Sequence, residues 1–186
     1  MAITINGSSN TITGLAVGGL PNGVVNTDML AAGEVTAAKR GRGSMLQIIE
    51  ASTNDRVETS STSFVATNLT ASITPNAGSN KILVQVSGDC NTNADDNELI
   101  MTVYRSIDGG SYSNLGNADF GFATARSNAE RLHSGVSIMF LDSPSSTAVV
   151  AYKVYIRKTS AGSGNVEFPS NDTYNKTYMH LTEIAA

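Results

Sequence analysis

Alternation of apolar and polar residues constrains the fold of this 186-residue chain more than any other feature. Between residues 81 and 87, Ile82, Val84 and Val86 occupy every second position, with Leu83 and Gln85 between them. Successive side chains of a β-strand point to opposite faces, so this period predicts a strand with one buried face. Strand-like segments also occur at residues 45–49, 64–65, 69–73, 98–107, 135–141, 149–158, 165–168 and 177–184.

These segments predict an all-β fold, since no long helical period accompanies them. About eight strands separated by polar loops favour an antiparallel β-sandwich, and a jelly roll of two four-stranded sheets is the preferred form. Asp108-Gly109-Gly110 is expected to form a tight hairpin turn, because glycine accepts positive φ. Residues 117–132 are expected to form either a short helix or a long loop.

Residues 1–43 differ from the rest and are predicted to form an extended arm before a sandwich domain of residues 44–186. Residues 3–5 and 11–13 are short alternating runs that could pair as a hairpin. Beyond them the apolar residues are spaced too irregularly for one helix face, so the arm needs another surface to bury them. The arm residues expected to be buried against that surface are Leu20, Val25, Leu30 and Val35.

The Gly41-Arg42-Gly43-Ser44 segment is expected to be a hinge between the two parts. Lys39, Arg40 and Arg42 form a short basic cluster beside it. This cluster either docks on the acidic surface of a partner or simply keeps the linker soluble.

Composition excludes several classes of function. The net charge is −4, which leaves no basic surface for a nucleic acid. The chain has no run of 18 apolar residues, so no transmembrane helix is predicted. The N-terminus does not have the pattern of a signal peptide. The single cysteine, Cys90, cannot form an intrachain disulfide. No cofactor is expected.

One polar run suggests a metal site. Asp89, Asn91, Asn93 and Asp95 place oxygen atoms at alternate positions, as a calcium loop does. However, Ala94 and Ile100 stand where the helix-loop-helix calcium motif has glycine and glutamate. The alternative is a solvated loop that uses Asn and Asp for its turns.

The residues for catalysis are sparse, and the chain is expected not to be an enzyme. Cys90 would need His133 or His180 beside it to act as a nucleophile, and the sequence does not place them together. Carboxylate pairs for glycoside cleavage can be nominated, but such pairs arise by chance in an acidic domain. The pairs are Asp96 with Glu98 and Glu130 with Glu167.

Aromatic residues on the predicted loops suggest a different kind of site. Tyr112, Phe120, Phe122, Tyr174 and Tyr178 could line a patch on which sugar rings stack. The alternative is that they are partly buried between subunits.

Residues 18–39 resemble the N-terminal arms of tailed-bacteriophage fibre proteins, which repeat Gly-x-Val-x-x-x-x-Leu and Val-Thr-x-x-Lys elements. Here the elements are Gly23-Val24-Val25 with Leu30, and Val35-Thr36 with Lys39. Residues 43–47, 62–75, 79–84 and 180–184 are similar to the C-terminal β-sandwich domain of the same proteins.

The resemblance implies a structural protein of the virion: a homotrimeric fibre or spike that is attached to the particle by its arm. A host-surface glycan is a further candidate partner. The chain is short for a host-binding fibre, so a head fibre or capsid decoration protein is the alternative, and a carbohydrate-binding module is another.

Overall fold

The computed structural model describes residues 4–6, 11–13, 39–128, 131–159, 163–170 and 175–186. The chain divides into two units, Met1–Arg40 and Gly41–Ala186. In the first unit, β1 (Thr4–Asn6) pairs antiparallel with β2 (Thr11–Thr13), which confirms the expected hairpin. Leu20, Val25, Leu30 and Val35 lie outside the described residues.

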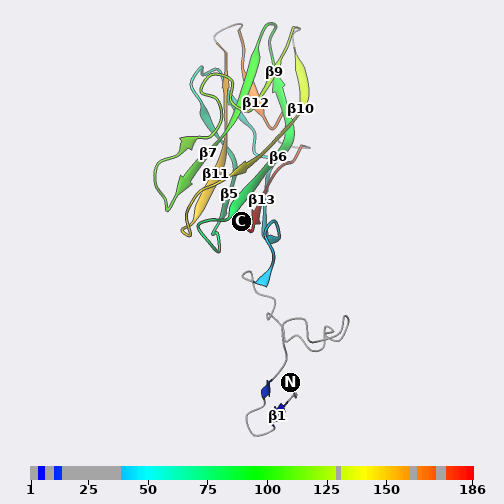
Figure 1. The fold of residues 1–186 in the computed structure, drawn as a ribbon. Helices are drawn as coiled ribbons and strands as arrows, with labels where there is room; N and C mark the ends of the chain where they lie inside the picture. The colour runs from blue at the N-terminus through cyan, green and yellow to red at the C-terminus, as the bar shows by residue number, and fades with distance from the viewer. Residues whose placement is uncertain (1–3, 7–10, 14–38, 129–130, 160–162, 171–174) are drawn as a thin grey trace. The chain divides into compact units, whose positions relative to one another are not determined.

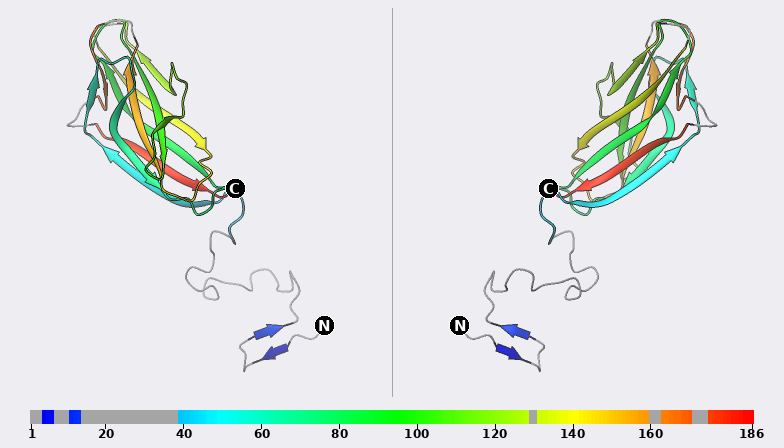
Figure 2. Two further views of the ribbon diagram at one scale, coloured as in Figure 1. Left: turned by 90° about the vertical axis from the view of Figure 1, so that its left-hand side faces the viewer. Right: turned by 90° about the vertical axis from the view of Figure 1, so that its right-hand side faces the viewer.

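The second unit consists of two antiparallel sheets that pack face to face (Figures 1 and 2). The first sheet contains β3 (Met45–Thr53), β4 (Val57–Thr59), β6 (Lys81–Thr92), β10 (Leu132–Asp142), β12 (Val166–Phe168) and β13 (Thr177–Ile184). The second contains β5 (Val65–Ile73), β7 (Glu98–Ile107), β8 (Ser113–Asn114), β9 (Ala123–Arg126) and β11 (Val150–Lys158).

The strand order is that of a jelly roll. The first sheet runs β3-β13-β6-β10, and the second runs β5-β11-β7-β9. In the first sheet, β12 pairs with the end of β6 beyond β13, and β4 pairs with β12. Every pairing is antiparallel, and the chain crosses between the sheets as two interlocked Greek keys. The predicted sandwich is therefore confirmed, and the pairings supply the strand order.

The alternating residues form the core between the sheets. Ile82, Val84 and Val86 of β6 are at most 1% exposed, and Val150, Tyr152, Val154 and Ile156 of β11 are fully buried. Burying one such aliphatic side chain contributes about 1.5–3 kcal/mol. The alternation thus identified the buried faces correctly.

One expectation within the sandwich needs correction. Residues 117–132 contain no helix in their described part, because residues 123–126 pair with β7 as β9. Ala123 and Ala125 pack against the core while Thr124 and Arg126 are exposed, so this short run also has a period of two.

The arm enters the sandwich where the chain also ends. Gly43 N donates to Ala185 O at 2.8 Å, and Ala185 N donates to Ser44 O at 2.9 Å. We call this end of the sandwich the junction end. The opposite end, where β6 finishes and β10 begins, is the distal end.

A buried carboxylate organises the junction end. Glu183 of β13 is 0% exposed and accepts hydrogen bonds from the Gln47 side chain and from both the backbone and the side chain of Asn76. Asn80 Nδ2 donates a further bond at 2.6 Å. Burial alone would raise the pKa of Glu183, but these bonds outweigh it and hold the pKa below its ordinary value.

Candidate functional site

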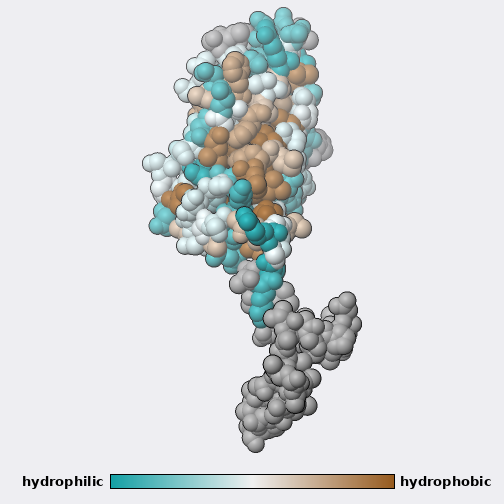
Figure 3. Space-filling model, viewed as in Figure 1, coloured by the Kyte–Doolittle hydropathy of each residue, from teal (hydrophilic) through white to brown (hydrophobic). Residues whose placement is uncertain are grey.

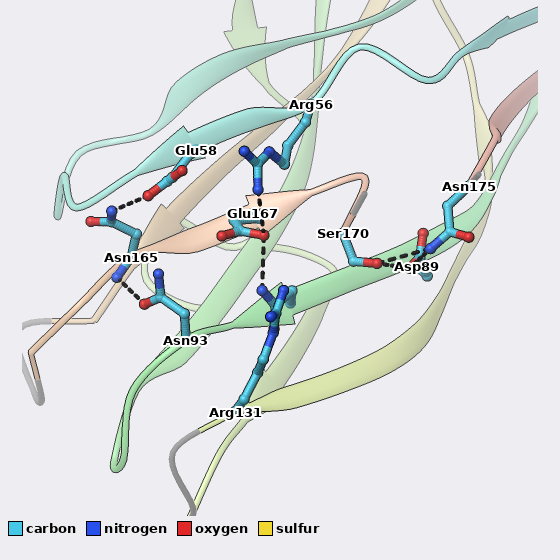
Figure 4. Close-up of polar contacts among 10 residues, drawn as sticks. Arg56, Glu58, Asp89, Asn93, Arg131, Asn165, Glu167, Ser170 and Asn175 are labelled. Carbon is cyan, nitrogen blue, oxygen red and sulfur yellow. Dashed lines mark hydrogen bonds and ion pairs between the residues drawn. The ribbon is translucent and has the colours of Figure 1, made fainter. Parts of the chain in front are cut away.

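A discontinuity in the first sheet creates the candidate site. One edge of β6 pairs with β13 along residues 81–87 and with β12 at residues 91 and 92. At residues 88–90 this edge of β6 has no strand partner among the described residues, and polar side chains lie beside it. Together with their neighbours at the distal end they form the distal polar cluster, drawn in Figure 4. Its members are Arg56, Glu58, Asp89, Asn91, Asn93, Arg131, Asn165, Glu167, Ser170 and Asn175.

Glu167 is the centre of one half of the cluster. It is 4% exposed and accepts a hydrogen bond from Asn91 Nδ2 at 2.8 Å, while Arg56 Nη1 lies 3.4 Å from the same carboxylate oxygen. Arg131 Nε donates to Asn91 Oδ1 at 3.3 Å. A buried carboxylate is costly unless it is paired and hydrogen-bonded, so these contacts hold Arg56 and Arg131 at the surface of the site.

Asp89 is the centre of the other half. Its Oδ2 atom accepts hydrogen bonds from Ser170 Oγ and from Asn175 Nδ2, the latter at 2.6 Å. Its Oδ1 atom is buried and has no hydrogen-bond partner among the described residues. A hollow of about 390 Å³, lined by Gly88, Asp89, Asn175 and Lys176, lies beside it.

Hydrogen bonds between loops hold the distal end together. Asn165 N donates to Asn93 Oδ1 at 2.6 Å, and Asn93 N donates back to Asn165 O at 3.2 Å. Asn97 Nδ2 donates to Asn165 O, and Ser127 N donates to Asn97 O, both at 2.9 Å. Side chains positioned in this way lose little conformational freedom when they bind a ligand.

The residues suggested for calcium take separate partners. Asp89 bonds Ser170, Asn91 bonds Glu167, and the side chain of Asn93 accepts from the Asn165 backbone. Asp95 accepts from the backbone of the next residue, Asp96. Among the described residues, no group of three or more His, Cys, Asp or Glu side chains could hold a metal ion.

Cys90 does not meet either histidine. Its side chain is 1% exposed and belongs to the core, whereas His133 and His180 lie on the outer face of the same sheet. Burial, with a smaller contribution from the Asp89 charge, raises the pKa of the thiol to about 11. The thiol is therefore protonated at neutral pH and unsuited to nucleophilic attack.

The nominated carboxylate pairs take other partners. Asp96 forms an ion pair with Arg126, and Glu167 has the contacts described above. Glu130 lies outside the described residues.

The aromatic side chains do not form the expected patch. Tyr178 stacks on His180 in the first sheet, whereas Phe122 stacks on Phe140 at a ring distance of 4.4 Å. Tyr112 lies over the second sheet, 6.3 Å from Tyr155. Phe120 is 61% exposed, and Tyr174 lies outside the described residues.

Sequence reasoning missed an aromatic group on the second sheet. Tyr104 of β7 and Tyr155 of β11 stack with their ring centroids 4.0 Å apart, and Phe64 meets Tyr104 edge-on. Tyr104 follows the core residue Val103, and Tyr155 follows the core residue Val154, so both tyrosines take outward positions on their strands. The alternation could have identified them, because it assigns each residue to a face. Their rings pack against each other, which leaves less ring surface for a sugar.

The chain matches no protein-family model and no curated protein sequence. Within the described residues, no helix has the length and apolar character needed to span a membrane.

Proposed function

We propose that this chain is a non-enzymatic structural protein of a bacteriophage virion. In this proposal it is a homotrimeric fibre or spike that is anchored through its N-terminal arm. Its distal polar cluster contacts a carbohydrate on the host surface. The virion assignment comes from the resemblance of residues 18–39 and of the sandwich strands to phage fibre proteins.

The separation of the two ends of the sandwich is the observation that supports this function best. The arm is joined at Gly41–Ser44, next to the last residues of the chain, and the distal polar cluster occupies the other end of the long strands. A molecule anchored at the junction end would present the distal end to solvent and to a host cell. The chemistry of the cluster suits sugars, because amides, carboxylates and guanidinium groups bond hydroxyls.

Capsid decoration is the second candidate. Lys39, Arg40 and Arg42 are exposed, and a basic segment before the sandwich would suit an acidic surface on a particle. In that case the arm would carry the main interaction. A carbohydrate-binding module remains compatible with either position on the particle.

A glycan array probed with the full chain tests the recognition step. Arg131→Ala removes an exposed cation of the distal polar cluster, and Lys153→Ala removes a cation from the outer face of the second sheet as a matched control. We expect the wild type and Lys153→Ala to bind the same glycans equally. Arg131→Ala should bind about tenfold more weakly, the loss expected for one charged hydrogen bond.

Equal binding by all three proteins would show that the distal polar cluster is not the contact. If no glycan is retained, mixing the chain with particles that lack it separates the candidates. Retention on such particles without binding to any glycan would favour decoration over host recognition.

A further inference from the structure

An apolar row crosses the outer face of the first sheet. Ile48 of β3, Thr182 of β13, Leu83 of β6 and Leu141 of β10 are register partners in successive strands. Ile48 is 57% exposed and Leu141 is 50% exposed. Three of these four side chains are aliphatic, while Thr182 between them is 4% exposed. A contiguous apolar patch on an exposed sheet face is typical of an interaction site.

The neighbouring rows extend this surface. Met45 pairs with Ile184 on the junction side, and Met139 lies opposite Gln85 on the other side. The side chains of Met45 and Met139 are 61% and 67% exposed. Figure 3 shows hydrophobic side chains gathered where β10 passes across the front of Figure 1. We call the surface made by Met45, Ile48, Leu83, Met139 and Leu141 the apolar face.

Polarity increases along this side of the sheet toward the distal end. The row of Met139 also contains Glu50 and His180, whose carboxylate and ring nitrogen lie 2.9 Å apart. The following row consists of Ser52, Tyr178, Ser87 and Ser137. The apolar face is thus confined to the half of the sheet nearest the junction with the arm.

We propose that a second copy of this chain covers the apolar face, so that this face joins the subunits of the appendage. The inference deepens the proposed function and rests on it for the expectation of a homo-oligomer. Its occupant follows from where the arm begins. Residues 1–38 continue from the junction end, and their apolar residues also need a surface, which sister arms can provide.

Association of the arms would hold the junction ends of neighbouring copies close together. Linked surfaces meet at a high effective concentration, so a modest apolar face becomes a stable contact. Charged residues border the apolar face on both sides. Lys81 is the register partner of Ile184 in the row of Met45, and Glu50 lies 2.9 Å from His180 in the row of Met139. A contact with a second copy would place these residues at its rim, where polar side chains are usual. The distal polar clusters would remain exposed at the other end.

Methionine oxidation tests this contact in the unmodified full chain. Exposed methionine is oxidised by hydrogen peroxide, and burial protects it. We expect Met139 to form sulfoxide several-fold more slowly in the oligomer than in a reference peptide of the same local sequence. Met101 and Met179, both 0% exposed, serve as internal standards for an intact core. Oxidation of Met139 at the peptide rate in an oligomer would overturn the proposal.

Charge substitutions test the same contact by solution mass. Leu141→Asp places a carboxylate on the apolar face, and Val149→Asp places one at an aliphatic residue that is 48% exposed outside it. We expect Leu141→Asp to dissociate the full chain and to speed oxidation of Met139. Val149→Asp should change neither readout. Slow oxidation of Met101 in Leu141→Asp would show that the variant is folded, and Ile48→Asp provides a second, independent substitution.

The outcomes separate this inference from the proposed function. An oligomer that survives both Leu141→Asp and Ile48→Asp contradicts the assigned face but leaves the appendage proposal standing. A monomeric wild type contradicts both. Protection of Met139 in a monomer would show that another segment of the same chain covers the face, which also contradicts the proposal.

Discussion

Glu183 makes the stability of the sandwich depend on pH. Hydrogen bonds hold the pKa of Glu183 below its ordinary value, so its ionised form stabilises the fold at neutral pH. This contribution is fully present above the unfolded pKa and is lost as the pH falls through the folded pKa. We expect stability to decrease from about pH 5 downward for this reason.

The Glu183→Gln variant isolates this contribution. Glutamine offers one acceptor oxygen and turns an amide toward the donors of Gln47, Asn76 and Asn80. We expect it to lower the free energy of unfolding by about 2–3 kcal/mol at pH 7. Urea titrations at several pH values should show the difference from wild type shrinking toward pH 3. A constant difference over that range would mean that Glu183 does not carry the effect.

The partners of individual polar side chains are the feature that the sequence predicts least well. Asp89 and Asn91 were expected in a calcium site or a solvated loop, whereas both belong to β6. Their partners, Ser170 and Glu167, come from a segment more than 70 residues later. Side-chain pairing over such separations depends on the register of β6 with its neighbours, which alternation within one strand does not specify.

At the scale of elements, alternation located the long strands well and the short ones poorly. The segment 81–87 was predicted, but β6 continues to Thr92, because Gly88 and Cys90 keep the inward period. The three-residue strand β4 and the four-residue strand β9 were not predicted, since so few residues cannot establish a period. Strand order came only from the pairings, because it depends on contacts far apart in sequence.

Gly121 shapes the loop that leads into β9. Its φ is +58°, and an added Cβ would lie 2.2 Å from the carbonyl oxygen of Met101. Because that atom belongs to the backbone of a central strand, it cannot turn aside. We expect Gly121→Ala to destabilise the fold by about 2–4 kcal/mol, from left-handed strain and overpacking together.

Gly135→Ala is the matched control, because a Cβ at Gly135 meets nothing within 4 Å. Urea unfolding of both variants at one protein concentration gives the comparison. Gly135→Ala should stay within about 1 kcal/mol of wild type. Similar unfolding midpoints for the two variants would contradict the role assigned to Gly121.

At the scale of the whole molecule, the two ends of the sandwich have different tasks in the proposed appendage. The junction end receives the arm and carries the apolar face, and the distal end carries the distal polar cluster. The sequence predicted an arm and a sandwich but not this polarity, because only the strand order shows which loops share an end. Self-association near the junction end would leave every distal polar cluster free for a ligand.

Light scattering on the full chain in solution tests this account most directly. The account predicts a mass of three chains of 19.4 kDa each, maintained on dilution through the micromolar range. Such a trimer would agree with an appendage whose arms and apolar faces bring the copies together. A stable mass of one chain would contradict the trimeric appendage and leave the apolar face without its proposed partner.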